Sequence, residues 1–260
     1  MTGRCRFAYA QARVQARYAE LPGEDAWQRL AAARTLGMFL EDAREGALRG
    51  WVKGFSAQSD AHDLDRGVRA IWQDEVTQVA AWLPRPWGSA LAWLRWLPLL
   101  PLLAHAGRGG SLPAWVGRDR ILQGLRRPDG TLDPAALAEA GAGALVPAQG
   151  EGASDPLRDW AAAWAGEWRR LWPPCDRRFL ANLDGLATLI GAHARAFPQA
   201  GGEVAWPLRR ELRERLRLGF HRLPLQPAAA FSYLALIALD LERLRAALMD
   251  RALFVLPEAV

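Results

Sequence analysis

Histidine and carboxylate side chains are the groups with which this chain could bind a metal ion or move a proton. The segment from His62 to Asp65 (HDLD) offers an imidazole and two carboxylates within one helical turn. No histidine stands in a spacing that zinc sites use, such as HExxH. Acidic residues also suit the first turn of a helix, because they face its positive end. We therefore interpret this segment as a helix start and predict no metal site.

The remaining candidates for catalysis are His193 and the cysteines Cys5 and Cys175. His193 falls on the apolar side of a helical pattern, which favours a core histidine over a catalytic base. The cysteines form no CxxC motif and have no histidine close in sequence, so the pattern indicates neither a disulfide nor zinc, and a reducing cytosol fits. An enzyme whose cysteine and histidine meet only in space stays an open alternative.

A glycine-rich turn, Gly107 to Gly110, could in principle cradle a phosphate group. Such a loop needs a strand before it and a helix start after it, whereas Ser111-Leu112-Pro113 follows here. The chain also lacks the GxSxG and GxxxxGK[ST] motifs. The sequence thus predicts neither catalysis nor a bound cofactor.

Four tryptophans recur at intervals of four residues: Trp160, Trp164, Trp168 and Trp172. This spacing keeps them on one side of a helix, with a drift of about 40° per step. The row could form an aromatic groove for a sugar or a quaternary cation. It could equally pack against neighbouring helices, each ring burying about 150–250 Å². We favour packing and keep the aromatic groove as the alternative.

The densest basic run extends from Pro207 to Arg222 (PLRRELRERLRLGFHR). We expect Pro207 to begin a helix that reaches Leu218, with its leucines against the core and its arginines pointing outward. This face is either solvated and salt-bridged or an interface with an acidic protein partner. We propose the interface, with these candidate residues: Arg209, Arg210, Arg213 and Arg217.

The composition describes a globular protein that does not bind nucleic acid. Of the 260 residues 51% are hydrophobic, which is enough for a packed core. The net charge is only +5, and arginines alternate with acidic residues along most predicted helices. The most apolar stretch, residues 91–106, is shorter than the ~20 residues that span a bilayer and is broken by Arg95 and Pro98. Any contact with a membrane is therefore expected to run through partners.

Helical periodicity dominates the chain and predicts an all-α fold, an irregular multi-helix bundle of packed helical lobes without a significant sheet. Thr35, Asp60 and Asp133 are suited to cap helices, and Pro227 to begin the last one. We expect a first lobe at residues 1–140, a loop rich in Gly, Ala and Pro at 141–154, and a second lobe at 155–260. In the last helix we expect Asp240 and Arg243 to lie outside the apolar stripe.

Both ends of the chain carry recognisable helical motifs. The matching residues of the first are Phe7, Ala8, Tyr9, Ala12, Arg13, Val14, Ala16 and Arg17; those of the last are Leu244, Arg245, Leu248, Arg251, Ala252 and Phe254. Together they resemble the ends of the C subunit of bacterial and archaeal V/A-type rotary ATPases, called d in eukaryotes. The chain is shorter than typical members of that family.

The resemblance implies a non-catalytic connector that links the central shaft to the membrane rotor ring. Its expected partners are the shaft subunits and the ring, and its expected location is the cytoplasm, peripheral to the inner face of the cell membrane. In isolation we expect a monomer, because no long heptad pattern is present. The competing hypothesis is an unrelated helical scaffold that binds a ligand or regulates a partner through the Trp160–Trp172 face.

Overall fold

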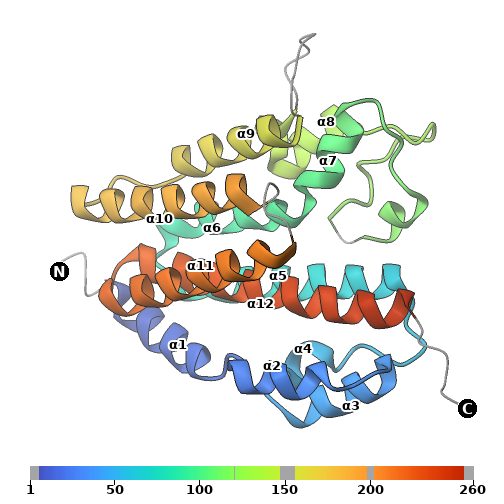
Figure 1. Cartoon of the computed structure of the whole chain (residues 1–260). Helices are drawn as coiled ribbons and strands as arrows, with labels where there is room; N and C mark the ends of the chain where they lie inside the picture. The colour runs from blue at the N-terminus through green and yellow to red at the C-terminus, as the bar shows by residue number, and fades with distance from the viewer. Residues whose placement is uncertain (1–5, 120, 147–155, 198–201, 255–260) are drawn as a thin grey trace, which may run out of the picture. The chain divides into compact units, whose positions relative to one another are not determined.

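The computed structural model describes residues 6–119, 121–146, 156–197 and 202–254 (Figure 1). The regular secondary structure of these ranges is helical, and the described residues contain no β-strand. One isolated antiparallel bridge joins Arg126 and Leu132 within a loop. The predicted all-α fold is confirmed.

Among the helices of these ranges, none combines the length and the apolar composition that a membrane-spanning segment requires.

The chain divides into two compact units. Unit 1 contains Met1–Arg85 and Pro174–Val260, and unit 2 contains Pro86–Pro173. This division differs from the predicted lobes, because the chain leaves and re-enters unit 1 next to prolines rather than at residues 141–154. Within that expected loop Gly141 has a left-handed φ of 83°, Gly143–Leu145 forms a 3₁₀ turn, and 147–154 lie outside the described residues.

The helices of unit 1 are α1 (Ala8–Ala19), α2 (Glu24–Ala31), α3 (Leu36–Glu45), α4 (Arg49–Val52), α5 (Ala61–Trp82), α10 (Arg177–Ala196), α11 (Gly202–Arg222) and α12 (Pro227–Leu253). The longest, α12, packs against α1, α3, α5, α10 and α11 and so forms the centre of the unit (red in Figure 1). The first and last helices of the chain are therefore direct neighbours.

The central place of α12 follows from its sequence. Pro227 occupies the first turn, where a missing backbone N–H is not needed. All residues from Ala228 to Leu234 are buried, so this first part of the helix is covered on every side. The rest of the helix is amphipathic, with Ile237, Leu241 and Leu244 inside.

Two predicted caps set the starts of neighbouring helices. The Asp60 side chain accepts a hydrogen bond from the Asp63 N–H at 2.7 Å and begins α5. The Thr35 hydroxyl accepts one from the Met38 N–H at 3.3 Å and begins α3. These caps confirm the prediction and fix the directions in which both helices leave their loops.

Unit 2 is built from shorter pieces: α6 (Gly88–Ala92), a 3₁₀ stretch (Trp93–Leu99), α7 (Leu100–Gly107), a 3₁₀ turn (Ala114–Arg118), α8 (Pro134–Leu137), a π turn (Ala138–Ala142), a 3₁₀ turn (Gly143–Leu145) and α9 (Pro156–Arg170). Pro101 lies in the first turn of α7, so it helps to begin a helix there. The long helix α9 packs against α7. A Cβ atom on Gly107 of α7 would lie 2.9 Å from the Trp160 ring, so this close approach requires glycine.

Candidate arginine-lined site

A pocket of about 250 Å³ opens where α11 and α12 meet the start of α2. Arginines from two helices dominate it, and its lining residues are Glu24, Trp206, Arg209, Arg210, Arg213, Leu239, Asp240 and Arg243. Three of the four arginines that the sequence proposed as an interface are thus brought together, and Arg217 is not among them. Arg243 is an addition that the sequence did not indicate.

Helices α11 and α12 form an antiparallel hairpin that positions the pocket. Contacts pair residues in opposite chain directions, from Arg209 with Glu242 to Gly219 near Ser232. Leu212 and Leu216 are buried and hold α11 against the core. The prediction that Pro207 begins this helix is wrong, because Pro207 lies inside α11, which starts at Gly202.

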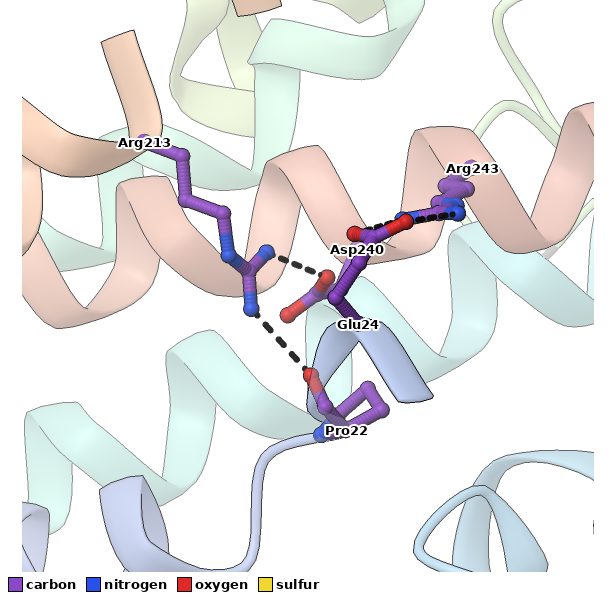
Figure 2. A network of polar contacts seen from close by, with 5 residues as sticks. All are labelled: Pro22, Glu24, Arg213, Asp240 and Arg243. Atoms are coloured by element: carbon purple, nitrogen blue, oxygen red, sulfur yellow. Dashed lines mark hydrogen bonds and ion pairs between the residues drawn. The ribbon is translucent and has the colours of Figure 1, made fainter. Parts of the chain in front are cut away.

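Arg213 turns inward and forms an ion pair with Asp240 (Figure 2). Its Nη1 lies 2.5 Å from Asp240 Oδ1, and its Nη2 donates to the Pro22 carbonyl at 3.3 Å. Asp240 is only 1% exposed. The expectation that Arg213 and Asp240 both face outward is therefore wrong. A signal existed in the sequence, since Asp240 follows Ile237 by three residues and precedes Leu244 by four.

The environment of Asp240 sets its protonation. Burial raises the pKa of this carboxyl group above its ordinary value, because removal from water disfavours the charged form. The charge of Arg213 and then its hydrogen bond act in the opposite direction. Arg213 is thus the main group that keeps a negative charge tolerable at this depth.

Arg243 already holds a carboxylate. Its two terminal nitrogens donate to the two Glu24 oxygens at 2.8 and 2.9 Å, the parallel geometry that guanidinium and carboxylate groups favour (Figure 2). The Arg243 guanidinium also lies 4.8 Å from the Trp27 ring centroid and 5.7 Å from that of Trp206. The hydrogen bonds from Arg243 lower the pKa of Glu24, with help from the charges of Arg213 and Arg210.

The other two lining arginines differ in the ion pairs that they form. Arg209 pairs with Glu242 at 2.8 Å and lies 4.5 Å from the Phe197 ring centroid. Arg210 is exposed and makes no ion pair within the part of the chain that the structure describes. Arg210 is therefore the lining cation that is most available to an incoming anion.

Arg217 belongs to a different surface. It pairs with Glu214 on its own helix at 2.9 Å, and both side chains are about half exposed. Nearby, Arg215 pairs with Glu211 at 2.6 Å in the same manner. This part of α11 is the salt-bridged, solvated face that the sequence offered as the alternative.

Electrostatics define what the pocket can do. Four guanidinium groups face two lining carboxylates, so an excess of positive charge remains next to the apolar surfaces of Trp206 and Leu239. Guanidinium groups recognise planar oxyanions through paired hydrogen bonds. The chemistry that these side chains provide is recognition of an anion.

The acidic residues near His62 serve the helix and its neighbours. Asp63 pairs with Arg66 at 2.6 Å, and Asp65 pairs with Arg69 and, at 2.5 Å, with Arg245 of α12. Within the described residues no group of three or more potential ligands could hold a metal ion.

His193 and Cys175 lie in partly buried positions. Burial lowers the pKa of His193, and the positive charge of Arg209 adds to that effect. The His193 ring stands 5.4 Å from the Phe197 ring, as expected for a packed histidine.

Burial and the charge of Asp176 raise the pKa of the Cys175 thiol, which disfavours a thiolate. Cys5 lies outside the described residues.

The glycine-rich turn is the carboxyl end of α7. Backbone N–H groups of Arg108, Gly109 and Gly110 donate back to the carbonyls of His105 and Ala106. Gly109 has a φ of 82°, the left-handed conformation that glycine adopts at helix ends. A phosphate loop presents N–H groups at a helix start, so this turn has the wrong polarity for that role.

The tryptophan row packs largely within α9 and its neighbours. Trp160 and Trp168 are 5% and 4% exposed. Trp164 stacks on Trp168 with centroids 5.8 Å apart, and Trp168 meets Trp172 edge to face at 5.0 Å. The indole N–H of Trp93 donates to the Trp164 carbonyl at 3.0 Å. These contacts agree with the packing interpretation rather than with an open aromatic groove.

No family model, no curated protein and no solved structure matches this chain significantly.

Proposed function

We propose that this protein is a non-catalytic connector subunit of a V/A-type rotary ATPase, linking the central shaft to the membrane rotor ring. The observation that carries the proposal concerns the arginines of the two terminal motifs, Arg13, Arg17, Arg245 and Arg251. Each of them makes a contact with a residue outside its own helix. The arginines of both motifs thus join helices of unit 1, which supports the proposal.

The first motif contributes a contact around a buried carboxylate. Arg17 Nη2 lies 2.8 Å from Glu75 Oε1, and the Trp51 indole N–H donates to the same oxygen at 3.3 Å. Glu75 is only 5% exposed. Burial and the charge of Glu75 raise the pKa of Tyr233 on α12. Arg17 therefore links α1 to α5 at a point next to the central helix.

Arg13 of the same motif adds a second contact, because its guanidinium lies 5.2 Å from the Trp82 ring centroid at the end of α5.

The last motif contributes two further links. Arg251 donates to the carbonyls of Ala33 at 2.9 Å and Leu30 at 3.2 Å, and its guanidinium lies 4.7 Å from the Phe39 ring centroid. It thereby adds side-chain donors to two backbone carbonyls near the end of α2, of which that of Leu30 also accepts from the Ala33 N–H at 3.3 Å. Arg245 pairs with Asp65 of α5.

Such links suit a part that transmits torque. A connector that binds a turning shaft must not yield, and close-packed helices with cross-links between them resist deformation. In this proposal the arginine-lined pocket is one protein contact of the assembly. Association with the inner face of the cell membrane would then depend on the rotor ring.

Deletion of the gene in the source organism tests the proposal. A missing connector uncouples shaft rotation from the ring, so inside-out membrane vesicles should lose ATP-driven ion transport while ATP hydrolysis by the remaining catalytic part continues. Expression of the wild-type chain should restore transport. Unchanged coupling in the deletion strain would contradict the proposed function.

A further inference from the structure

Only some of the arginines that line the pocket form ion pairs within the fold. Arg213 pairs with buried Asp240, and Arg209 pairs with Glu242 at the rim. Arg210 makes no ion pair within the described ranges, and Trp206 is 53% exposed although it is a large aromatic side chain. Within those ranges, an arginine without an ion pair in a pocket that also contains an exposed indole is more than the packing of α11 requires.

Glu24 shows which chemistry the pocket accepts. Its carboxylate is held in parallel hydrogen bonds by Arg243, and that guanidinium lies near the rings of both Trp27 and Trp206. The Glu24 side chain is 57% exposed, so it lies at the mouth of the pocket and not in the core. A carboxylate from another chain could take its place without a change in the fold.

We propose that this pocket binds an acidic segment of a protein partner, in which a Glu or Asp side chain lies next to an aromatic or large apolar one. Arg210 binds the carboxylate, and Arg243 joins it when Glu24 is displaced. Trp206 and Leu239 contact the apolar side chain. Glu24 is therefore an internal competitor that weakens the binding of the partner.

Size and charge select this occupant. A volume of about 250 Å³ lies below the ~300–1,000 Å³ range of pockets for drug-sized molecules, which fits a pair of side chains. The two carboxylates in the lining repel polyanions such as phosphate chains. A ligand with a single carboxylate is attracted by the positive charge that the lining carboxylates leave uncompensated. Arginine and tryptophan are also the residues that most often dominate protein interfaces.

The acidic segment would belong to a partner that binds the surface used in the proposed function, so the identity of the partner rests on that function. Peptide binding to the isolated protein and assembly in membranes are separate measurements. Loss of the first with intact assembly rejects the pocket, and loss of the second with intact peptide binding rejects the rotary assignment.

The test measures the affinity of a labelled synthetic peptide in which glutamates flank a single phenylalanine. Fluorescence anisotropy compares the wild type with Arg210→Gln, Trp206→Ala and Glu24→Gln. Arg215→Gln is the matched control, since it removes one charge from the exposed face of the same helix outside the pocket. The same peptide with glutamine for glutamate, inorganic phosphate, a DNA duplex and phosphatidylglycerol vesicles are the comparison ligands.

We expect Arg210→Gln and Trp206→Ala to weaken binding of the acidic peptide by about tenfold, as for a central interface residue. Glu24→Gln should tighten it several-fold, because the internal competitor is removed. Arg215→Gln should change it less than about twofold. Wild-type affinity in Glu24→Gln, equal effects of the Arg210 and Arg215 changes, or preference for the neutral peptide, phosphate, DNA or vesicles would each overturn the inference.

Discussion

The guanidinium of Arg213 lies 2.5 Å from the carboxylate of Asp240, which is almost fully removed from solvent. This ion pair joins α11 to the central helix α12, and a second bond from Arg213 reaches the Pro22 carbonyl before α2. Arg213 therefore supports the wall of the arginine pocket. Arg213 thus differs from Arg210, which lines the same pocket but is exposed.

Replacement of Arg213 by glutamate should destabilise the protein strongly. It removes the partner of a buried charge and adds a second negative charge next to Asp240. Loss of one member of a buried ion pair costs about 3–5 kcal/mol, and the partial exposure of Arg213 favours the lower end. Urea unfolding monitored by circular dichroism measures the change.

Arg217→Glu is the matched control for this substitution. Its side chain is 49% exposed, and it forms a surface ion pair with Glu214, so the expected loss is at most ~1 kcal/mol. Equal effects of the two reversals would mean that the Arg213–Asp240 pair contributes no more than a surface contact.

Truncation of Trp168 to alanine should destabilise unit 2. The ring is 4% exposed and lies between Trp164 and Trp172, so its removal leaves a cavity that costs about 3–5 kcal/mol. Trp206→Ala, at an exposed ring, should cost less than about 1 kcal/mol. Differential scanning calorimetry compares the melting temperatures of the two variants. A wild-type melting curve for Trp168→Ala would contradict the packing interpretation and favour the aromatic groove.

Gly67 and Gly185 should respond to alanine in opposite directions. Both lie inside long helices, where alanine is intrinsically favoured by about 1 kcal/mol. A Cβ atom at Gly67 would lie 2.2 Å from the Phe55 ring, whereas none of the described atoms lies within 4 Å of the corresponding position at Gly185. We expect Gly67→Ala to lower and Gly185→Ala to raise the free energy of unfolding in urea. A stabilised Gly67→Ala variant would show that Phe55 does not pack closely on α5.

Acid should weaken the contribution of Glu24 to stability. Hydrogen bonds from Arg243 hold the folded-state pKa of Glu24 below its ordinary value of 4.5. The unfolded chain therefore takes up the proton first, so this stabilisation is present above about pH 4.5 and lost as the pH falls through the folded-state pKa. The stability difference between wild type and Glu24→Gln, measured in urea, should shrink between about pH 7 and about pH 3. A difference that grows on acidification would contradict the assigned ion pair.

Local signals in the sequence predicted the helices well. Thr35 is predicted to cap a helix, and α3 begins directly after it at Leu36. The cap at Asp60 and the proline at Pro227 likewise placed the starts of α5 and α12. These positions could be predicted because caps and proline act through bonds within one turn of the chain.

The candidate site was only partly accessible from the sequence. The basic run identified α11, yet the inward turn of Arg213 depends on Asp240, which lies 27 residues away on another helix. Glu24 and Arg243 are separated by 219 residues, and no local pattern links them. The usual place of proline predicts a helix start at Pro207, whereas α11 already begins at Gly202 and continues through this residue.

Co-purification from native membranes tests the central claim most directly. A tagged chain, expressed in its source organism and extracted in mild detergent, should bring down the rotor-ring and shaft subunits of a rotary ATPase, identified by mass spectrometry. Arg210→Gln should recover less of them than Arg215→Gln, at equal expression and equal melting temperature. If the wild-type chain recovers none of these subunits, it is not a connector of a rotary ATPase.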